Sequence, residues 1–250
     1  MNKIIGPDVS FYQDDPDTSR GIDFLKMKAA GAQFSIIRAG QNLWEDNEFD
    51  ISWAASKGVL PRGSYWFYDS RVDPKLQARK WLSCFADPND LGEFGFWCDF
   101  EERYGGAFTG WKHWYTFIEE LRRIAPNAKI GIYTGYYYWR EFTIAKNIPA
   151  ASLQYFKQFP LWIAHYKVDT PLVPAPWSTW TLWQYTDDGN GKTYGVESNE
   201  IDLNYFNGSE VELASFTGNQ PQQEPEKPTP QSDPIVKARL FRKSGKVEEL

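Results

Sequence analysis

Apolar and polar positions follow two alternating patterns along the first 212 residues of the chain. Short apolar runs, mostly bounded by Gly, Pro or polar clusters, are typical of buried strands. Between the first five runs, and again after the fifth, apolar residues recur at three- and four-residue spacing, which predicts amphipathic helices. The runs predict strands over residues 4–10, 34–39, 63–68, 94–101, 129–134, 161–166, 181–185 and 201–205. The helical spacing predicts helices over residues 23–30, 47–57, 74–85, 111–124 and, more weakly, 136–145.

This order of elements predicts the fold class. Strands that alternate with helices favour a parallel sheet covered by helices. Eight strands in one domain favour closure into a barrel, and the weak helical pattern between the last three strands predicts an irregular last third. An open doubly wound sheet is the alternative, but it would usually carry a Gly-rich phosphate loop, and DVSFYQDD after the first strand is not one. We therefore expect an α/β fold with a single irregular β/α barrel over residues 1–212.

The composition changes after the expected barrel. The segment GNQPQQEPEKPTPQSDP is rich in Pro, Gln and Glu and nearly free of apolar residues, so it cannot bury enough surface to fold. We expect a linker over residues 213–234. The last segment, 235–250, is too short for a domain; it could pair as a small hairpin or begin a further module.

Charge and cysteine content exclude several classes of function. The net charge of −6 argues against a nucleic-acid partner and against a polybasic membrane anchor. Cys84 and Cys98 are the only cysteines, which excludes a disulfide framework and a Cys-rich zinc site, so we expect two free buried thiols. His113 and His165 lack further metal ligands in the pattern, so no metal or cofactor is expected. The sequence shows no signal peptide and no run of ~20 apolar residues, which predicts a soluble protein.

The fourth expected strand ends in acids, within the segment FWCDFEE. Side chains alternate along a strand, so one face carries Phe96, Cys98 and Phe100. Trp97, Asp99 and Glu101 share the other face. In a barrel the apolar set suits the helix layer, and the acids then point to the axis at the C-terminal end, where barrel enzymes place their chemistry. Glu102 falls on the opposite parity, past the strand end, and is left out of the catalytic set.

The spacing of Asp99 and Glu101 suits proton transfer. Their Cα atoms lie about 6.5–7 Å apart on a strand, so one carboxylate can raise the pKa of the other and keep it protonated. A proton donor beside a charged carboxylate is what glycosidic bond cleavage needs. Asp8 and Asp202 lie on the first and last strands, which are neighbours in a closed barrel. Each acid alone could be a solvated strand end, a turn or a cap, but the four together favour a catalytic site.

The chain resembles glycoside hydrolase family 25, the lysozymes of bacteria and their phages. The motifs that carry the resemblance are DVSFYQ, FSIIRAG, GSYWFY, DFE, IGIYTGYYYW, LWIAHY, LWQYT and IDLNYF, in this order over about residues 3–208. The resemblance implies a barrel of five β/α units followed by three strands. It also implies cleavage of the β-1,4 bond between N-acetylmuramic acid and N-acetylglucosamine in peptidoglycan.

The resemblance implies a role for each acid. Glu101 matches the general acid that protonates the leaving oxygen. Asp99 matches its partner, which acts either on the N-acetyl group of the substrate or on a water, and the sequence leaves this choice open. Asp8 and Asp202 match the acids that support the site and its charge balance.

Other polar residues at strand ends are candidates for substrate binding. Tyr68, Tyr133 and Tyr166 each end an expected strand at the same rim, where rings and hydroxyls could hold a sugar. Arg38 and Gln184 are similarly placed and could donate hydrogen bonds. Packing at the rim is the alternative for all five.

The expected partner is the glycan strand of peptidoglycan, bound by a monomer. Two other hypotheses are a sugar-binding module without turnover and a structural component of a phage particle. In either case the tail after residue 234 could dock to a partner or precede a wall-binding module. The absence of a signal peptide leaves three routes to the wall: phage-lysin release, a place in the virion, or unconventional export.

Overall fold

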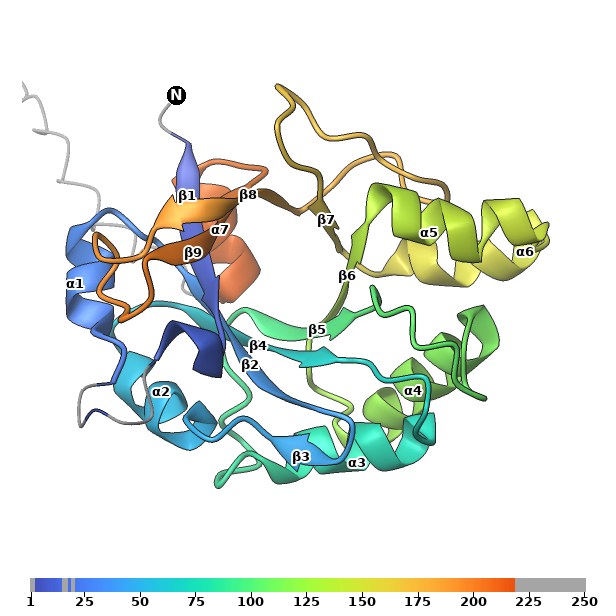
Figure 1. Cartoon of the computed structure of the whole chain (residues 1–250), viewed down its shortest axis with the longest axis horizontal. Helices are drawn as coiled ribbons and strands as arrows, with labels where there is room; N and C mark the ends of the chain where they lie inside the picture. The colour runs from blue at the N-terminus through green and yellow to red at the C-terminus, as the bar shows by residue number, and fades with distance from the viewer. Residues whose placement is uncertain (1–2, 15–17, 19–20, 219–250) are drawn as a thin grey trace, which may run out of the picture. The chain divides into compact units, whose positions relative to one another are not determined.

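The computed structural model describes residues 3–14, 18 and 21–218 (Figure 1). Within this part of the chain eight strands close into a barrel in the order β1-β9-β8-β7-β6-β5-β4-β2, because β1 also pairs with β2. The short β3 pairs with β2 outside the ring. The strands are β1 (Ile4–Val9), β2 (Ser35–Gln41), β3 (Trp44–Glu45), β4 (Arg62–Phe67), β5 (Gly95–Asp99), β6 (Ile130–Gly135), β7 (Leu161–Ala164), β8 (Leu182–Asn190) and β9 (Glu200–Phe206).

Helices follow the first five barrel strands, as the sequence predicts. They are α1 (Phe24–Ala29), α2 (Phe49–Ser56), α3 (Pro74–Ser83), α4 (Trp111–Ile124) and α5 (Tyr136–Phe142). Local sequence explains the start of α3: the Asp73 carboxylate accepts the N–H groups of Lys75 and Leu76, and Pro74 occupies the first turn. A short helix α6 (Ala150–Leu153) precedes β7. The fold is thus five β/α units followed by three strands, which confirms the predicted irregular barrel.

The last strand, β9, is antiparallel to its neighbours, whereas the sequence predicted a parallel strand. β9 is antiparallel to both β8 and β1, whereas the other neighbouring barrel strands are parallel. An antiparallel pair needs only a loop, but a parallel pair needs a crossover of a dozen or more residues, usually a helix. No helix lies between β8 and β9. The antiparallel direction of β9 therefore corrects the expectation of a parallel sheet, and the missing helical pattern before β9 is consistent with this direction.

The short α6 and the longer α7 were not expected from the sequence. α7 (Glu210–Thr217) begins with a capping box between Ser209 and Glu212 and ends at Gly218 in the left-handed conformation. Its Leu213 and Phe216 pack against the apolar cluster inside the barrel. The boundary predicted at residue 212 therefore falls inside α7. Most of the expected linker, from residue 219, and the whole tail over 235–250 lie outside the described residues.

The barrel separates two apolar clusters. Phe96, Cys98 and Phe100 pack in the outer cluster beneath the helices, while Trp97 packs inside the ring, so the predicted faces of β5 are confirmed. The interior is filled by aromatic rings, and glycine makes room for them: a Cβ on Gly131 would lie 2.4 Å from the Trp97 ring. Cys84 and Cys98 are free and buried, as predicted.

Candidate active site

The four acids gather at one mouth of the barrel. Asp99 is the last residue of β5, and Glu101 follows two residues later. Asp8 lies near the C-terminal end of β1 and pairs in register with Asp202 on β9. Because β9 is antiparallel, Asp202 reaches this mouth from near the start of its strand. The convergence predicted for these four residues is therefore present, although Asp202 arrives by a different strand direction.

Gln184 on β8 connects residues from both sides of the mouth. Its side-chain Nε2 donates to Asp8 Oδ2 at 3.0 Å and to Asp202 Oδ2 at 3.2 Å. Its Oε1 accepts the hydroxyls of Tyr133 at 2.8 Å and Tyr166 at 2.6 Å. The side chain is buried with both ends of its amide in use. Gln184 thus holds four other predicted site residues in one orientation, namely Asp8, Asp202, Tyr133 and Tyr166.

The Tyr133 hydroxyl also lies 3.3 Å from Glu101 Oε2. A phenol has one O–H, and the shorter contact to Gln184 uses it. The hydroxyl can instead donate to Glu101 Oε2, but not to both acceptors at once. A hydrogen bond donated to Glu101 lowers the pKa of that carboxyl, so it opposes the effect of burial.

A model of glycosyl hydrolases family 25 matches residues 7–194, which is most of the chain. The chain belongs to glycosyl hydrolases family 25. Lysozyme M1 of Streptomyces globisporus is 27% identical over 227 residues, covering 86% of this chain and 72% of that protein. The YegX protein of Escherichia coli strain K12 is 30% identical over 225 residues, covering 85% of this chain and 73% of that protein.

Solved structures of this family share the fold. The bacterial lysozyme from Streptomyces coelicolor aligns with a TM-score of 0.68 at 26% identity, covering 88% of this chain and 99% of that chain. The irregular barrel is therefore the family 25 fold, and the acid cluster lies at the C-terminal ends of its parallel strands, where barrel enzymes carry their active sites.

Burial governs the electrostatics of this family 25 site. It raises the pKa of Glu101 to about 7, and the nearby Asp8 charge adds to the effect. Burial also raises the pKa of Asp99 well above its usual range, and repulsion from the Glu101 charge raises this pKa further. The Arg38 cation lowers the pKa of Asp99 and so opposes both effects. Among the described residues Asp99 Oδ1 is a buried atom with no hydrogen-bond partner. The Asp99–Glu101 pair therefore holds protons at neutral pH and keeps one carboxylate oxygen unpaired.

Asp8 and Asp202 form a second coupled pair. Their carboxyl groups share a hydrogen bond, which requires that one of them carries a proton. Burial raises the pKa of both, and the Asp8 charge raises that of Asp202 further. Asp8 keeps the lower pKa because it accepts Nδ2 of Asn204 at 2.8 Å as well as the Gln184 amide. Asp202 therefore carries the proton of this pair.

Arg38 lies at the site but is held by a residue that was not predicted. Its Nε donates to Asp46 Oδ2 at 2.8 Å, and both side chains are buried. The guanidinium carbon lies 4.8 Å from the centre of the Phe11 ring and 5.7 Å from that of Trp44. In the described part of the chain its Nη2 is buried and has no hydrogen-bond partner. Arg38 is thus a fixed cation with one donor still available.

Tyr68 is the one predicted site residue that the structure does not bring to this mouth. Its ring packs in the outer cluster, 5.6 Å from Phe100 and 5.4 Å from Phe117, and its hydroxyl donates to the Phe108 carbonyl. The expectation rested on its place at a strand end and ignored parity. Tyr68 lies on the outward side of the chain with Trp66.

Two site residues were missed that parity and register would have found. Tyr65 on β4 pairs in register with Trp97, so its ring faces the interior, where it meets Trp162 at 6.0 Å. Asn204 lies two residues from Asp202 on β9, on the same face. Its Oδ1 accepts the Trp162 indole N–H at 2.7 Å. Asn204 thereby helps to hold Asp8, to which its Nδ2 donates, and the charges of Asp8 and Asp99 add to the effect of burial in raising the pKa of the Tyr65 hydroxyl.

Glu102 has a structural role. Its buried carboxylate accepts the N–H of Ser70 at 3.1 Å and that of Tyr104, which ties together the loops after β4 and β5. This agrees with its exclusion from the catalytic set.

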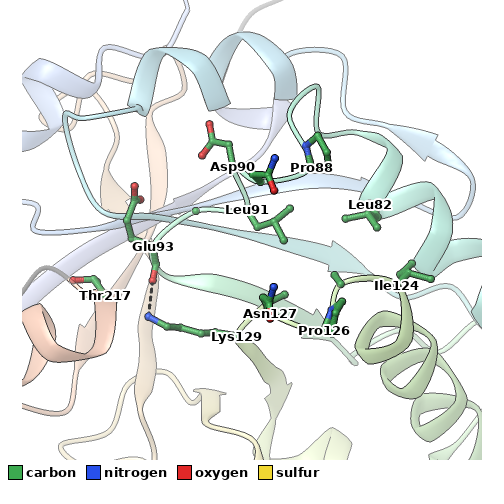
Figure 2. A pocket seen from close by; sticks show the side chains of 14 residues that line it. Leu82, Pro88, Asp90, Leu91, Glu93, Ile124, Pro126, Asn127, Lys129 and Thr217 are labelled. Carbon is green, nitrogen blue, oxygen red and sulfur yellow. Dashed lines mark hydrogen bonds between the residues drawn. The ribbon is translucent and has the colours of Figure 1, made fainter.

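A hollow of about 470 Å³ lies at the opposite end of the barrel (Figure 2). Its acids are already engaged: Asp90 pairs with Arg62, and the Glu93 carboxylate accepts the Arg62 N–H. Figure 2 shows the Lys129 ammonium donating to the Glu93 carbonyl. Both acids among the described residues that line this hollow therefore already have partners.

No group of three or more His, Cys, Asp or Glu side chains in the described part of the chain could hold a metal ion. None of its helices is long and apolar enough to cross a membrane.

Proposed function

We propose that this family 25 glycoside hydrolase is a lysozyme that cleaves the β-1,4 bond between N-acetylmuramic acid and N-acetylglucosamine in peptidoglycan. The observation that carries the proposal is Glu101, a carboxyl held protonated near neutral pH beside a second carboxyl on the same strand end. The names of its relatives support it, since they include Lysozyme M1 and a bacterial lysozyme.

In this proposal Glu101 donates its proton to the glycosidic oxygen as the C1–O bond breaks. The leaving sugar keeps that proton, and Glu101 becomes a carboxylate. It then takes a proton from the water that completes hydrolysis, so its acid form is restored. The buried surroundings of Glu101 and the nearby Asp8 charge restore the raised pKa in each cycle.

Asp99 is proposed to orient the N-acetyl group of the substrate. Its unpaired Oδ1 can accept the amide N–H of that group, and such a hydrogen bond favours the ionised form of Asp99. Substrate binding would then ionise Asp99 and leave the proton on Glu101. The amide oxygen can attack C1 and form a cyclic intermediate that water opens. Orientation of an attacking water by Asp99 is the alternative course.

Substrate contacts are proposed for Arg38, Tyr133 and Tyr166. Arg38 offers its free Nη2 donor, and the two tyrosines offer ring edges and hydroxyl oxygens at the mouth. Gln184, with its amide fully used, positions Asp8, Asp202 and the tyrosines. We place the reaction at the bacterial cell wall.

The test compares wild type with Glu101→Gln on purified cell walls. We expect the variant to lose at least about 100-fold in activity, because a positioned general acid contributes about 10²–10⁴-fold. Its circular dichroism should be unchanged. Glu119→Gln, on the flank of α4, serves as the matched control and should keep full activity. Equal activity of Glu101→Gln and wild type would refute the role of this acid.

The digestion products show which bond is cut and whether the N-acetyl group or a water attacks C1. Mass spectrometry should find fragments with N-acetylmuramic acid at the new reducing end. NMR of the first product should show retained anomeric configuration if the N-acetyl group attacks, and inverted configuration if a water does. Wall binding without any new reducing ends would instead indicate a sugar-binding module.

A further inference from the structure

A groove runs along the outer flank of the barrel beside β8 and β9. Two hollows of about 560 and 590 Å³ lie there and share Lys3, Asp169, Trp183 and Tyr205 in their walls. Because they share these residues, they form one continuous depression, here called the flank groove. It lies on the outward side of the strands, whereas the four acids lie on the inward side.

The floor of the flank groove is a row of aromatic rings. Trp180 meets Trp183 at 6.0 Å, Trp183 meets Tyr205 at 5.6 Å, and Tyr205 stacks on Tyr185 at 3.9 Å with an angle of 8°. Trp180, Tyr185 and Tyr205 are only partly buried. Rings that present part of their surface in a concave site, with a few polar groups near, are typical of small-molecule binding. Pyranose rings are suitable ligands because they offer flat C–H faces.

Polar groups for a sugar stand beside the rings. The Trp180 indole N–H donates to no protein group in the described part of the chain, whereas that of Trp183 donates to the His165 carbonyl at 2.8 Å. Lys3 lies with its ammonium 4.1 Å from the centre of the Tyr205 ring. A free donor beside a ring allows stacking and a hydrogen bond to a hydroxyl or an acetamido oxygen at once.

The flank groove offers two ammonium groups to a peptidoglycan strand. Lys3 and Lys167 are exposed in its walls, although the chain as a whole carries a net charge of −6. Asp169 and the Glu212 carboxylate, which accepts the Ser209 hydroxyl, also line the groove and balance these two charges. The peptide stems of peptidoglycan carry carboxylates, so two ammonium groups beside an aromatic floor suit this polymer.

The flank groove begins beside the active site. Lys167 directly follows Tyr166, whose hydroxyl binds Gln184, and Tyr185 directly follows Gln184. The mouth and the flank groove are thus two faces of the same strand ends. A glycan that passes over the rim at Tyr166 arrives at Lys167 and then at the ring row.

We propose that the flank groove is a second saccharide-binding site, which holds a part of the peptidoglycan glycan away from the bond being cut. The choice of this polymer rests on the proposed lysozyme function. The flank site supplies wall affinity that the negatively charged molecule does not gain from long-range electrostatics.

The experiment measures binding to purified walls stripped of teichoic acids, with Glu101→Gln protein so that the wall is not digested. Adding Trp180→Ala should weaken binding about three- to tenfold, as expected for the loss of one aromatic contact. Adding Lys167→Ala tests the charge and should weaken binding most at low salt. Tyr115→Ala is the matched control, because Tyr115 is 41% exposed on α4 and packs on Tyr155; it should bind like the parent.

Unchanged binding by the Trp180→Ala and Lys167→Ala proteins would overturn the proposal. An effect seen only on walls that retain teichoic acids or wall proteins would also overturn it, since the occupant would then be a phosphate polymer or a protein. Should Trp180→Ala fail to fold, the exposed Lys167→Ala change still decides. Wall digestion by the wild type is scored separately, so a failure of the lysozyme activity is distinguishable from a failure of the flank site.

Discussion

In the proposed function, the protonation of Glu101 sets the pH range of activity. Burial raises its pKa from the usual range to about 7, and a general acid acts only while protonated. We therefore expect kcat/KM on soluble muropeptides to be sustained below pH 7 and to fall about tenfold per pH unit above it. A pH–rate profile checks this. A profile that falls only above pH 9 would contradict the assignment of Glu101.

Arg38 depends on Asp46 for its position. In Asp46→Asn the carboxylate that holds the buried guanidinium is lost, which costs about 1–3 kcal/mol of interaction and frees the cation to turn towards Asp99. We expect kcat/KM to fall about tenfold and the pKa in the pH–rate profile to shift downwards. Asp50→Asn on the exposed side of α2 is the control and should change neither. An unaltered profile in Asp46→Asn would leave Asp46 without a role in the site.

At the scale of the residue, the sequence predicted which residue types form the site better than it predicted which side chains contact one another. The acids were found because carboxylates at the end of an apolar run are unusual. Asp46 could not be found in the same way, because nothing in its neighbourhood shows that the chain folds back to place it on Arg38. Tyr68 and Tyr65 differ only in parity along one strand, and that signal was available.

At the scale of elements, β6 shows how tightly the interior is filled. A Cβ at Gly131 would lie 2.4 Å from the Trp97 ring, so Gly131→Ala must displace an indole in a closed ring of strands. We expect destabilisation of about 1–3 kcal/mol in chemical unfolding. Gly135→Ala on the same strand is the matched control, because its Cβ would meet only Tyr138 at 3.8 Å. Equal stability of the two variants would contradict the packing described.

The elements with strong local signals were predicted well. Helix α4 has the predicted bounds, because its apolar stripe is long and regular. α7 was missed because it is short and follows directly on the last strand. The direction of β9 depends on which strands become neighbours, and local periodicity does not contain that information.

At the scale of the whole molecule, α7 completes the domain at the base of the barrel. A chain that ends at residue 218 retains Leu213 and Phe216 in the inner cluster, and we expect it to keep the melting temperature and the activity of the full chain on soluble substrate. A chain that ends at residue 209 exposes that cluster and should unfold at lower temperature. Differential scanning calorimetry checks both. Equal melting of the two truncated chains would show that α7 adds no stability.

The strand that carries Asp202 and Asn204 is the last of the barrel, and this has a consequence for the cell that makes the protein. A nascent chain shorter than 202 residues contains only three of the four acids and lacks most of β9, the strand that joins β1 to β8. Synthesis of the domain is therefore nearly finished before the four acids can come together. If the proposed lysozyme function holds, we expect fragments that end before β9 to be inactive on cell walls.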